Sequence, residues 1–375
     1  MGKKKILAMS GLALLGAVTL FIAAPTVAMA GEDIGPLPKR KAPKASMVEM
    51  GKRLFYDARI SGDGAISCAT CHDPRKGFGD GQPLSKAYPG SDYFRNSATL
   101  LNVVYKSGFS DVGWGWDGRM GSSLNDVMRD QITETTILNL DMRILHERMK
   151  QDPTYVKMCK ENFNGECSSG KARKALIAYV ETLVSTGDAP FDKGNMSKDA
   201  KAGMKLFKGK AGCIKCHNGS YFSDGKPHNT GVAENLEVFK NAVRHATYRA
   251  VLTTYGVPKG GQWRRDVGYF FTSKKYADVG KFITPTLREL KYTAPYMHNG
   301  TIKSLKDVVE FYNNGGGHDD PLARELKKLG LSSGEKKQLV AFLESLSSPK
   351  QPGKIDPPKI PQEYPVIEDW LNKKN

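Results

Sequence analysis

Two copies of one short motif constrain this chain more than any other feature of its sequence. Residues 68–72 read CATCH and residues 213–217 read CIKCH, so both fit C-x-x-C-H. This pattern is typical of covalent haem attachment, in which two thiols add to the vinyl groups of the porphyrin and the adjacent imidazole binds the iron. We therefore expect two haem c groups. The residues expected to hold them are Cys68, Cys71 and His72, and Cys213, Cys216 and His217.

Two other kinds of site also use closely spaced cysteines. A structural zinc site can be built from four thiolates, and a thioredoxin-like site uses one reactive pair. A four-thiolate zinc site would not need a histidine after each pair, and a redox dithiol would need only one pair. The duplicated motif therefore favours two covalent haems over either alternative.

The chain has six cysteines, and the last two are Cys159 and Cys167. In an oxidising compartment this spacing can close a disulfide. Such a bridge would stabilise the fold by roughly 2–3 kcal/mol through loop closure. The alternative is a pair of buried thiols.

The haem motifs sit inside a weak internal repeat, which predicts the fold class. GKRLF at 51–55 precedes the first motif, and GMKLF at 203–207 precedes the second. Helices are expected over 47–55 and 198–207, each followed by the loop that carries a haem motif. Further helices are expected over 171–183 and after the capping box formed by Ser332 and Glu335. We predict a mainly α protein with two cytochrome c-like haem domains in tandem.

The predicted organisation has three parts. Residues 1–30 have three lysines, a long apolar run and a small-x-small end, which is typical of a secretory signal peptide, although an uncleaved membrane anchor is the alternative. Residues 31–190 are expected to form the N-terminal haem domain, and residues 191–375 the C-terminal one. The proline-rich tail after Ser348 is expected to be an extended strap. An exported, periplasmic location follows from this reading.

The charge of the chain bears on its partners. The formal net charge is +17, and residues 1–30 hold three lysines and no acidic residue, so +14 remains after their removal. A basic exported protein could attract acidic partners, or could simply have a solvated basic surface. No nucleic-acid-binding motif is present.

Five further segments, in this order, carry a resemblance to a known family. They are RLFYDARISGDGAISCATCHDP, FRNSATLLNV, WDGR, GCIKCHNG and TPTLRELKYTAPYMHNG. Together with the haem motifs, they resemble the bacterial di-haem cytochrome c peroxidases and their relative MauG over nearly all of the chain after residue 30. The resemblance implies that the N-terminal haem meets hydrogen peroxide, that the C-terminal haem relays electrons, and that a calcium ion lies between them.

The same resemblance implies roles for individual residues. Trp116 in WDGR matches the tryptophan that carries electrons between the haems. Asn96 in FRNS matches a calcium ligand, and Thr293 and Pro295 match residues that offer backbone carbonyls to that ion. His298 in YMHNG matches a histidine near the haems. The alternatives are a packed core tryptophan for Trp116 and a turn residue for Asn96.

The second axial ligand of the C-terminal haem is expected to be Tyr312. Leu305, Val308, Val309 and Tyr312 fall at helical spacing, so the tyrosine lies on the apolar face of a helix that Ser304 can cap. The resemblance implies that this position is a methionine in the peroxidases and a tyrosine in MauG. The alternative is a core tyrosine. A phenolate favours the ferric state, so this haem should be hard to reduce.

The N-terminal haem is expected to be five-coordinate. Many peroxidases of the family have a histidine in the loop after the first motif, and residues 77–97 contain none. Tyr88 or Tyr93 could approach the iron instead. The resemblance also implies a glutamate, and often a glutamine, on the peroxide side, and Val127 and Ile137 stand at those two positions here. Glu134 or Gln131 could substitute if the helix is shifted, and without such an acid peroxide turnover should be slow.

These expectations combine into one function and one rival. The main expectation is an exported di-haem oxidoreductase that reacts with hydrogen peroxide and passes oxidising equivalents through Trp116 and the His217/Tyr312 haem. These equivalents then oxidise an electron-donor protein or a protein substrate. An acidic surface on that partner would suit the basic charge of this chain. The rival is a non-enzymatic electron carrier or haem-based sensor. A homodimer is compatible with the sequence.

Overall fold

The computed structural model describes residues 33–88, 91–317, 326–353 and 356–360. The predicted signal peptide, residues 1–30, and His318 lie outside the described residues. Within them the protein is mainly helical, as predicted, with two small antiparallel pairs, β1–β2 and β3–β4. The helices are α1 Ala45–Tyr56, α2 Cys68–Cys71, α3 Leu124–Thr133, α4 Met142–Gln151, α5 Pro153–Phe163, α6 Ser169–Val180, α7 Lys198–Lys208, α8 Glu237–Lys240, α9 Ala242–Thr254, α10 Phe270–Ser273, α11 Leu305–Asn313 and α12 Ser333–Ser345. The strands are β1 Lys86–Ala87, β2 Ser91–Asp92, β3 Pro227–His228 and β4 Phe282–Ile283.

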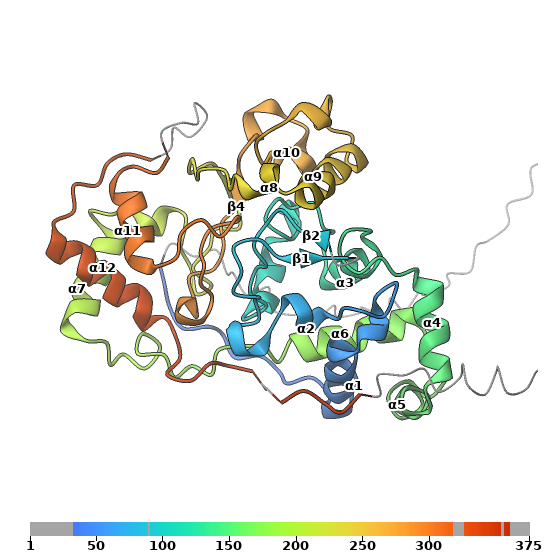
Figure 1. Ribbon diagram of the computed structural model, residues 1–375. Coiled ribbons are helices and arrows are strands. Elements are labelled where there is room, and N and C mark those ends of the chain that lie inside the picture. The colour runs from blue at the N-terminus through green and yellow to red at the C-terminus, as the bar shows by residue number, and fades with distance from the viewer. Residues whose placement is uncertain (1–32, 89–90, 318–325, 354–355, 361–375) are drawn as a thin grey trace, which may run out of the picture.

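The first core forms around the packing of α1 against α6 (Figure 1). Met50, Leu54 and Phe55 of α1 are buried in it. Gly51 allows the close approach, because a Cβ there would lie 1.9 Å from the carbonyl oxygen of Ala175. This core contains residues from 50 to 183 and surrounds the first haem motif.

A second core repeats this arrangement with α7 and α12. A Cβ on Gly203 of α7 would lie 1.9 Å from the carbonyl oxygen of Gln338, so glycine again permits two helices to cross closely. The predicted capping box is present at the start of α12, where Ser332 and Glu335 satisfy each other's backbone N–H groups. Ile34, near the start of the described chain, packs into this second core.

A third cluster forms a separate lobe, which lies at the top of Figure 1 and contains α8, α9 and α10. Tyr248, Leu252 and Phe271 are buried in it, and Phe94 from the N-terminal half packs against them. The sequence reading did not anticipate this lobe.

Two further connections join separate segments of the fold, a disulfide buried in the first core and an extended segment near the C-terminal end of the described chain. Cys159 of α5 and Cys167 form a disulfide, which confirms the pairing expected from their spacing. The chain after Ser348 crosses from α12 toward α1, as the red trace in Figure 1 shows, and Arg53 donates a hydrogen bond to the carbonyl of Lys359 at 3.1 Å. This is the strap that the prolines predicted. Among the described residues, no helix has the length and apolar character needed to span a bilayer.

Candidate haem centres

The first motif lies on a single helical turn, α2, that begins after Ser67. The Ser67 and Thr70 side chains satisfy the backbone N–H groups at this end, so the turn is fixed locally. Burial, followed by the proximity of Cys71, raises the pKa of the Cys68 thiol to about 12. Burial also raises the pKa of Cys71 to about 12. A reactive dithiol needs a lowered pKa, so these cysteines do not fit a thioredoxin-like site.

The imidazole of His72 is oriented for an iron ligand. Its Nδ1 lies 2.9 Å from the carbonyl oxygen of Phe78, and a carbonyl can only accept, so Nδ1 carries the proton. Nε2 then has its lone pair available, which is the arrangement found in metal-ligating histidines. Burial lowers the pKa of His72, so the ring is held neutral as ligation requires.

The second motif repeats this geometry. His217 Nδ1 lies 3.0 Å from the carbonyl oxygen of Phe222, and burial again lowers the pKa of the imidazole. Phe78 and Phe222 are both fully buried and both have a φ of 56°. The left-handed conformation turns each phenylalanine carbonyl back toward its histidine. Burial, with a smaller contribution from Cys216, raises the pKa of Cys213 to about 12.

Tyr312 is brought to the second motif by α11. Ser304 caps this helix by accepting a hydrogen bond from Asp307 N at 3.1 Å, as expected, and Leu305 and Val309 on the same face are buried. Burial raises the pKa of the Tyr312 phenol, and the next causes are the neighbouring Cys213 and Cys216. The phenol therefore lies close to the sulfurs of the second motif. A hydrogen bond with Thr230 acts in the opposite direction.

The candidate relay residue and the candidate calcium ligands lie together. Trp116 Nε1 donates to the carbonyl oxygen of Asn96 at 3.0 Å, and Asn96 N donates to the carbonyl oxygen of His298 at 2.8 Å. The Asn96 amide nitrogen donates to Gln82 O at 2.6 Å, which leaves the side-chain oxygen of Asn96 available. Within the described residues, no hydrogen bond reaches the carbonyl oxygens of Thr293 or Pro295. Oxygen donors without partners fit a calcium ion.

Comparison with known proteins identifies the chain. Residues 45–201 match a family described as di-haem cytochrome c peroxidase. A relative named cytochrome-c peroxidase IdrP2, from Denitromonas iodatirespirans, is 46% identical over 92% of this chain and 93% of its own. The methylamine utilization protein MauG of Methylorubrum extorquens is 33% identical over 87% of this chain and 84% of its own. The chain belongs to the di-haem cytochrome c peroxidase and MauG family.

Solved structures have the same fold. A MauG-like protein associated with microbial copper homeostasis superposes with a TM-score of 0.68 at 24% identity, covering 84% of this chain and 93% of its own. The di-haem peroxidase BthA from Burkholderia thailandensis superposes with a TM-score of 0.66 at 20% identity, covering 85% of this chain and 90% of its own. As a family member, the chain is a c-type di-haem oxidoreductase, and the two histidine–cysteine motifs described above have the chemistry to hold its haems.

His298 is a buried, packed ring in the structure. It is 4% exposed and stacks on Phe282 with the ring centroids 3.6 Å apart. Its Nε2 has no hydrogen-bond partner among the described residues. Burial lowers its pKa to about 3, so the ring is neutral.

A buried ionic network beside Trp116 was missed by the sequence analysis. Arg95 donates to Asp117 at 2.6 Å and to both oxygens of Asp266 at 2.6 Å, and Arg119 donates to Asp117 at 2.8 Å. Burial alone would raise the pKa of Asp117, but Arg119 and Arg95 lower it to about 2. The signal was present, because these residues flank Asn96 and Trp116 in FRNS and WDGR. Arg119 also donates a hydrogen bond to the hydroxyl of Tyr93. Tyr93 is one of the two tyrosines considered as ligands of the first iron, and its phenol is bonded to this network instead.

Glu134 is placed at the end of α3, where it caps the helix. Its carboxylate is within 3.5 Å of the Tyr255 hydroxyl from the lobe and 3.3 Å of the Thr136 hydroxyl. The side chain is partly buried. The two hydroxyls orient the carboxylate, which is the arrangement expected of a positioned acid.

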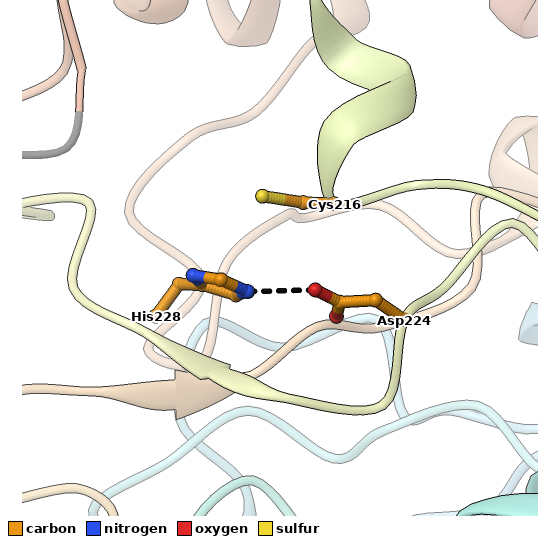
Figure 2. A group of neighbouring side chains, drawn as sticks. All are labelled: Cys216, Asp224 and His228. Atoms are coloured by element: carbon orange, nitrogen blue, oxygen red, sulfur yellow. Dashed lines mark hydrogen bonds and ion pairs between the residues drawn. The ribbon is translucent and has the colours of Figure 1, made fainter. Parts of the chain in front are cut away.

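Figure 2 shows a third polar group, next to the second motif. Cys216, Asp224 and His228 have potential ligand atoms within 4.8 Å of one another, and His228 Nε2 lies 2.8 Å from Asp224 Oδ2. The His228 side chain is only 22% exposed. In this family the Cys216 sulfur would be consumed in a thioether bond. The group is therefore a polar wall of the haem site and not a separate metal centre.

Proposed function

We propose that this protein is an exported di-haem peroxidase of the MauG type, built from two haem domains at residues 31–190 and 191–375. Peroxide reacts at the iron held by His72, and Trp116 connects that centre to a second one held by His217 and Tyr312. The two helix crossings, α1 on α6 and α7 on α12, support the two-domain division because α1 contacts the turn of the first haem motif, α2, and α7 contacts the turn of the second, Cys213–Lys215. The signal-like residues 1–30 and the Cys159–Cys167 disulfide support export, since such bonds persist in oxidising compartments.

The observation that carries the proposal is the asymmetry between the two motifs. Tyr312 lies on the helix whose buried face includes Leu305 and Val309, and burial followed by Cys213 and Cys216 raises its pKa, which supports a place near the second motif. The chain has no histidine between His72 and His146 that could fill the corresponding position at the first. An iron with one protein ligand can bind a substrate, and an iron with two mainly transfers electrons. This asymmetry supports a reaction of peroxide on the His72 side.

When bound, the haems supply irons that exchange electrons with peroxide. Hydrogen peroxide takes up two electrons and two protons and leaves as two molecules of water. The carboxylate of Glu134, oriented by Tyr255 and Thr136, is the candidate to hold and deliver a proton through its Oε2 atom. Trp116 provides an aromatic ring fixed by its hydrogen bond to Asn96. The electrons come from a donor protein or from a protein substrate.

Calcium is the proposed third cofactor. Asn96 would bind it through its side-chain oxygen, and Thr293 and Pro295 through their carbonyls, with waters completing the shell. Because Asn96 also accepts the Trp116 N–H, an ion at this position would rigidify the relay residue.

Electron paramagnetic resonance of the resting haem-loaded protein, followed by stoichiometric peroxide, tests the proposal. We expect one high-spin ferric signal from the His72 centre, one low-spin signal from the His217/Tyr312 centre, and loss of both on adding peroxide. Two low-spin signals that do not change with peroxide would instead support the rival, a non-enzymatic electron carrier or haem-based sensor.

A further inference from the structure

The lobe formed by α8, α9 and α10 has an excess of positive charge. Residues 237–281 contain nine lysines and arginines but only three acidic residues. One of these acids, Asp266, is 6% exposed and bonded to Arg95 in the interior, so it does not offset the surface charge. The lobe therefore presents an excess of positive charge to solvent.

An open groove lies on this basic surface. It has a volume of about 480 Å³ and follows the segment between α9 and α10. Its lining contains three cations and no acid; the residues are Pro258, Lys259, Gln262, Trp263, Arg264 and Arg265. We call this the basic groove.

The base of the groove is rigid and aromatic. The Trp263 ring stacks on Phe270 with an interplanar angle of 24° and centroids 6.0 Å apart. Its Nε1 donates to the carbonyl of Pro258 at 3.0 Å, so the indole is fixed from two sides. A half-buried tryptophan surrounded by cations is typical of the anchor residues found at protein interfaces.

Two of the three cations of the groove, Lys259 and Arg264, form no ion pair among the described residues. Arg264 instead donates to the carbonyls of Gly261 and Trp263. Burial, then Arg264 and Arg249, lowers the pKa of the nearby His245, which reflects the same positive potential. Uncompensated exposed charge of one sign steers oppositely charged partners.

The groove is connected to the relay tryptophan by a short chain of contacts. Arg265 in its lining is followed by Asp266, which binds Arg95 at 2.6 Å. Arg95 binds Asp117 at 2.6 Å, and Asp117 follows Trp116 in the chain. A redox partner bound in the groove would thus be linked to Trp116 through covalent bonds and buried ion pairs.

We propose that the basic groove is the docking surface for an acidic redox protein that donates electrons to this peroxidase. The proposal rests on the proposed function. The partner would place carboxylates against Lys259 and Arg264 and an apolar side chain against Trp263. The groove is open and its cations are exposed, which suits the broad face of a protein better than a small anion. Each peroxide consumed requires two electrons. One turnover therefore needs two successive one-electron oxidations of the partner protein.

The experiment compares two charge-reversal double variants of the haem-loaded protein. Lys259→Glu/Arg264→Glu reverses the groove, and Lys157→Glu/Lys160→Glu makes the same charge change on α5, which lies far from the lobe in Figure 1. The probes are an acidic blue-copper protein and a basic mitochondrial-type cytochrome c. Calorimetry at low and high salt measures binding, and peroxide turnover is measured with each probe and with an uncharged dye.

We expect the groove variant to bind the acidic probe at least roughly tenfold more weakly than wild type at low salt. Attraction between opposite charges speeds the encounter of the two proteins, and the variant replaces it with repulsion. The α5 variant should bind it nearly as well as wild type, and dye turnover should be unchanged in both. Equal weakening in the two variants would overturn the proposal, since it would show an effect of net charge alone. It would also be overturned if the acidic probe does not bind wild type, or if the groove variant weakens binding of the basic cytochrome c as much as binding of the acidic probe. Failure of wild-type turnover with the dye would instead overturn the proposed function.

Discussion

The indole N–H of Trp116 and the carbonyl oxygen of Asn96 are joined by a hydrogen bond of 3.0 Å. The neighbouring residues, Asp117 and Arg95, form a second link of 2.6 Å between the same two segments. The hydrogen bond and the ion pair thus together fix the proposed relay residue relative to the proposed calcium ligand. Their geometry is coupled, so a change at either residue should affect electron transfer between the two centres.

Trp116→Phe tests the relay. Phenylalanine keeps an aromatic ring but loses the N–H and is much harder to oxidise, so we expect slow electron transfer between the centres. Loss of the hydrogen bond should lower the free energy of unfolding by only about 1 kcal/mol. Stopped-flow absorbance after peroxide addition measures the transfer, and Tyr276→Phe, at an exposed aromatic residue of the lobe outside the groove, is the control. Unchanged transfer in the Trp116 variant would exclude a relay role.

Tyr312→Met tests the second axial ligand. A thioether stabilises ferrous iron relative to a phenolate, so the reduction potential of the C-terminal centre should rise by a large part of the ~0.8 V range that axial ligands cover. Spectroelectrochemical titration measures it. Tyr296→Phe, at a half-buried tyrosine that precedes α11, is the control and should leave the potential unchanged. If the Met variant has the wild-type potential and spectrum, Tyr312 is a core residue.

His72→Ala tests where peroxide reacts. Cys68 and Cys71 can still attach the haem, but the iron loses its imidazole, so reactivity with peroxide should disappear while the spectrum of the second centre persists. Haem staining confirms attachment, and His245→Ala in the lobe is the control. Full residual reactivity would place the peroxide reaction at the other motif.

Chelation of calcium tests the third cofactor. Removing the ion should loosen Asn96 and slow the electron transfer that depends on Trp116, and added calcium should restore it. Asn96→Ala should lose the ion, because the side chain is the ligand. Thr293→Ala should keep it, because a backbone carbonyl is the ligand there. Metal analysis of the purified variants that finds the reverse order would refute this ligand set.

The lowered pKa of Asp117 predicts that the free energy of unfolding depends on pH in the acidic range. Its pKa falls from an ordinary value of 3.8 to about 2, because Arg119 and Arg95 outweigh the effect of burial. A carboxyl whose pKa is lower in the folded state stabilises the fold fully above its unfolded pKa. This contribution, roughly 2 kcal/mol, is lost as the pH falls from about 4 toward 2.

Urea unfolding of wild type and Asp117→Asn across this pH range measures that contribution. At neutral pH the variant should be less stable by about 3–5 kcal/mol, because the buried Arg119 loses its counter-ion and Arg95 keeps only Asp266. Asp141→Asn is the control: Arg143 lowers the pKa of Asp141 to about 2 as well, but that pair is exposed to solvent. The prediction fails if both variants lose the same small amount.

The sequence by itself determined the parts of this protein that depend on local chemistry. The spacing of Cys68, Cys71 and His72 follows from the geometry of a porphyrin edge, and the capping box at Ser332 follows from the unpaired N–H groups of a helix start. The helical spacing of Leu305, Val308, Val309 and Tyr312 places Tyr312 on the apolar face of α11. Such features require only neighbours within a few residues, so they can be read from the chain.

The tertiary structure alone decided the features that join distant segments. Nothing in FRNS or WDGR indicates that Arg95 pairs with Asp266, which lies 171 residues away. The lobe was missed because its short helices α8 and α10 have no strong periodicity, and they are stabilised by Phe94 from the other half of the chain. The partial burial of His228 depends on the β3–β4 pairing. Buried charges need partners wherever the fold provides them, and only packing determines which residues those are.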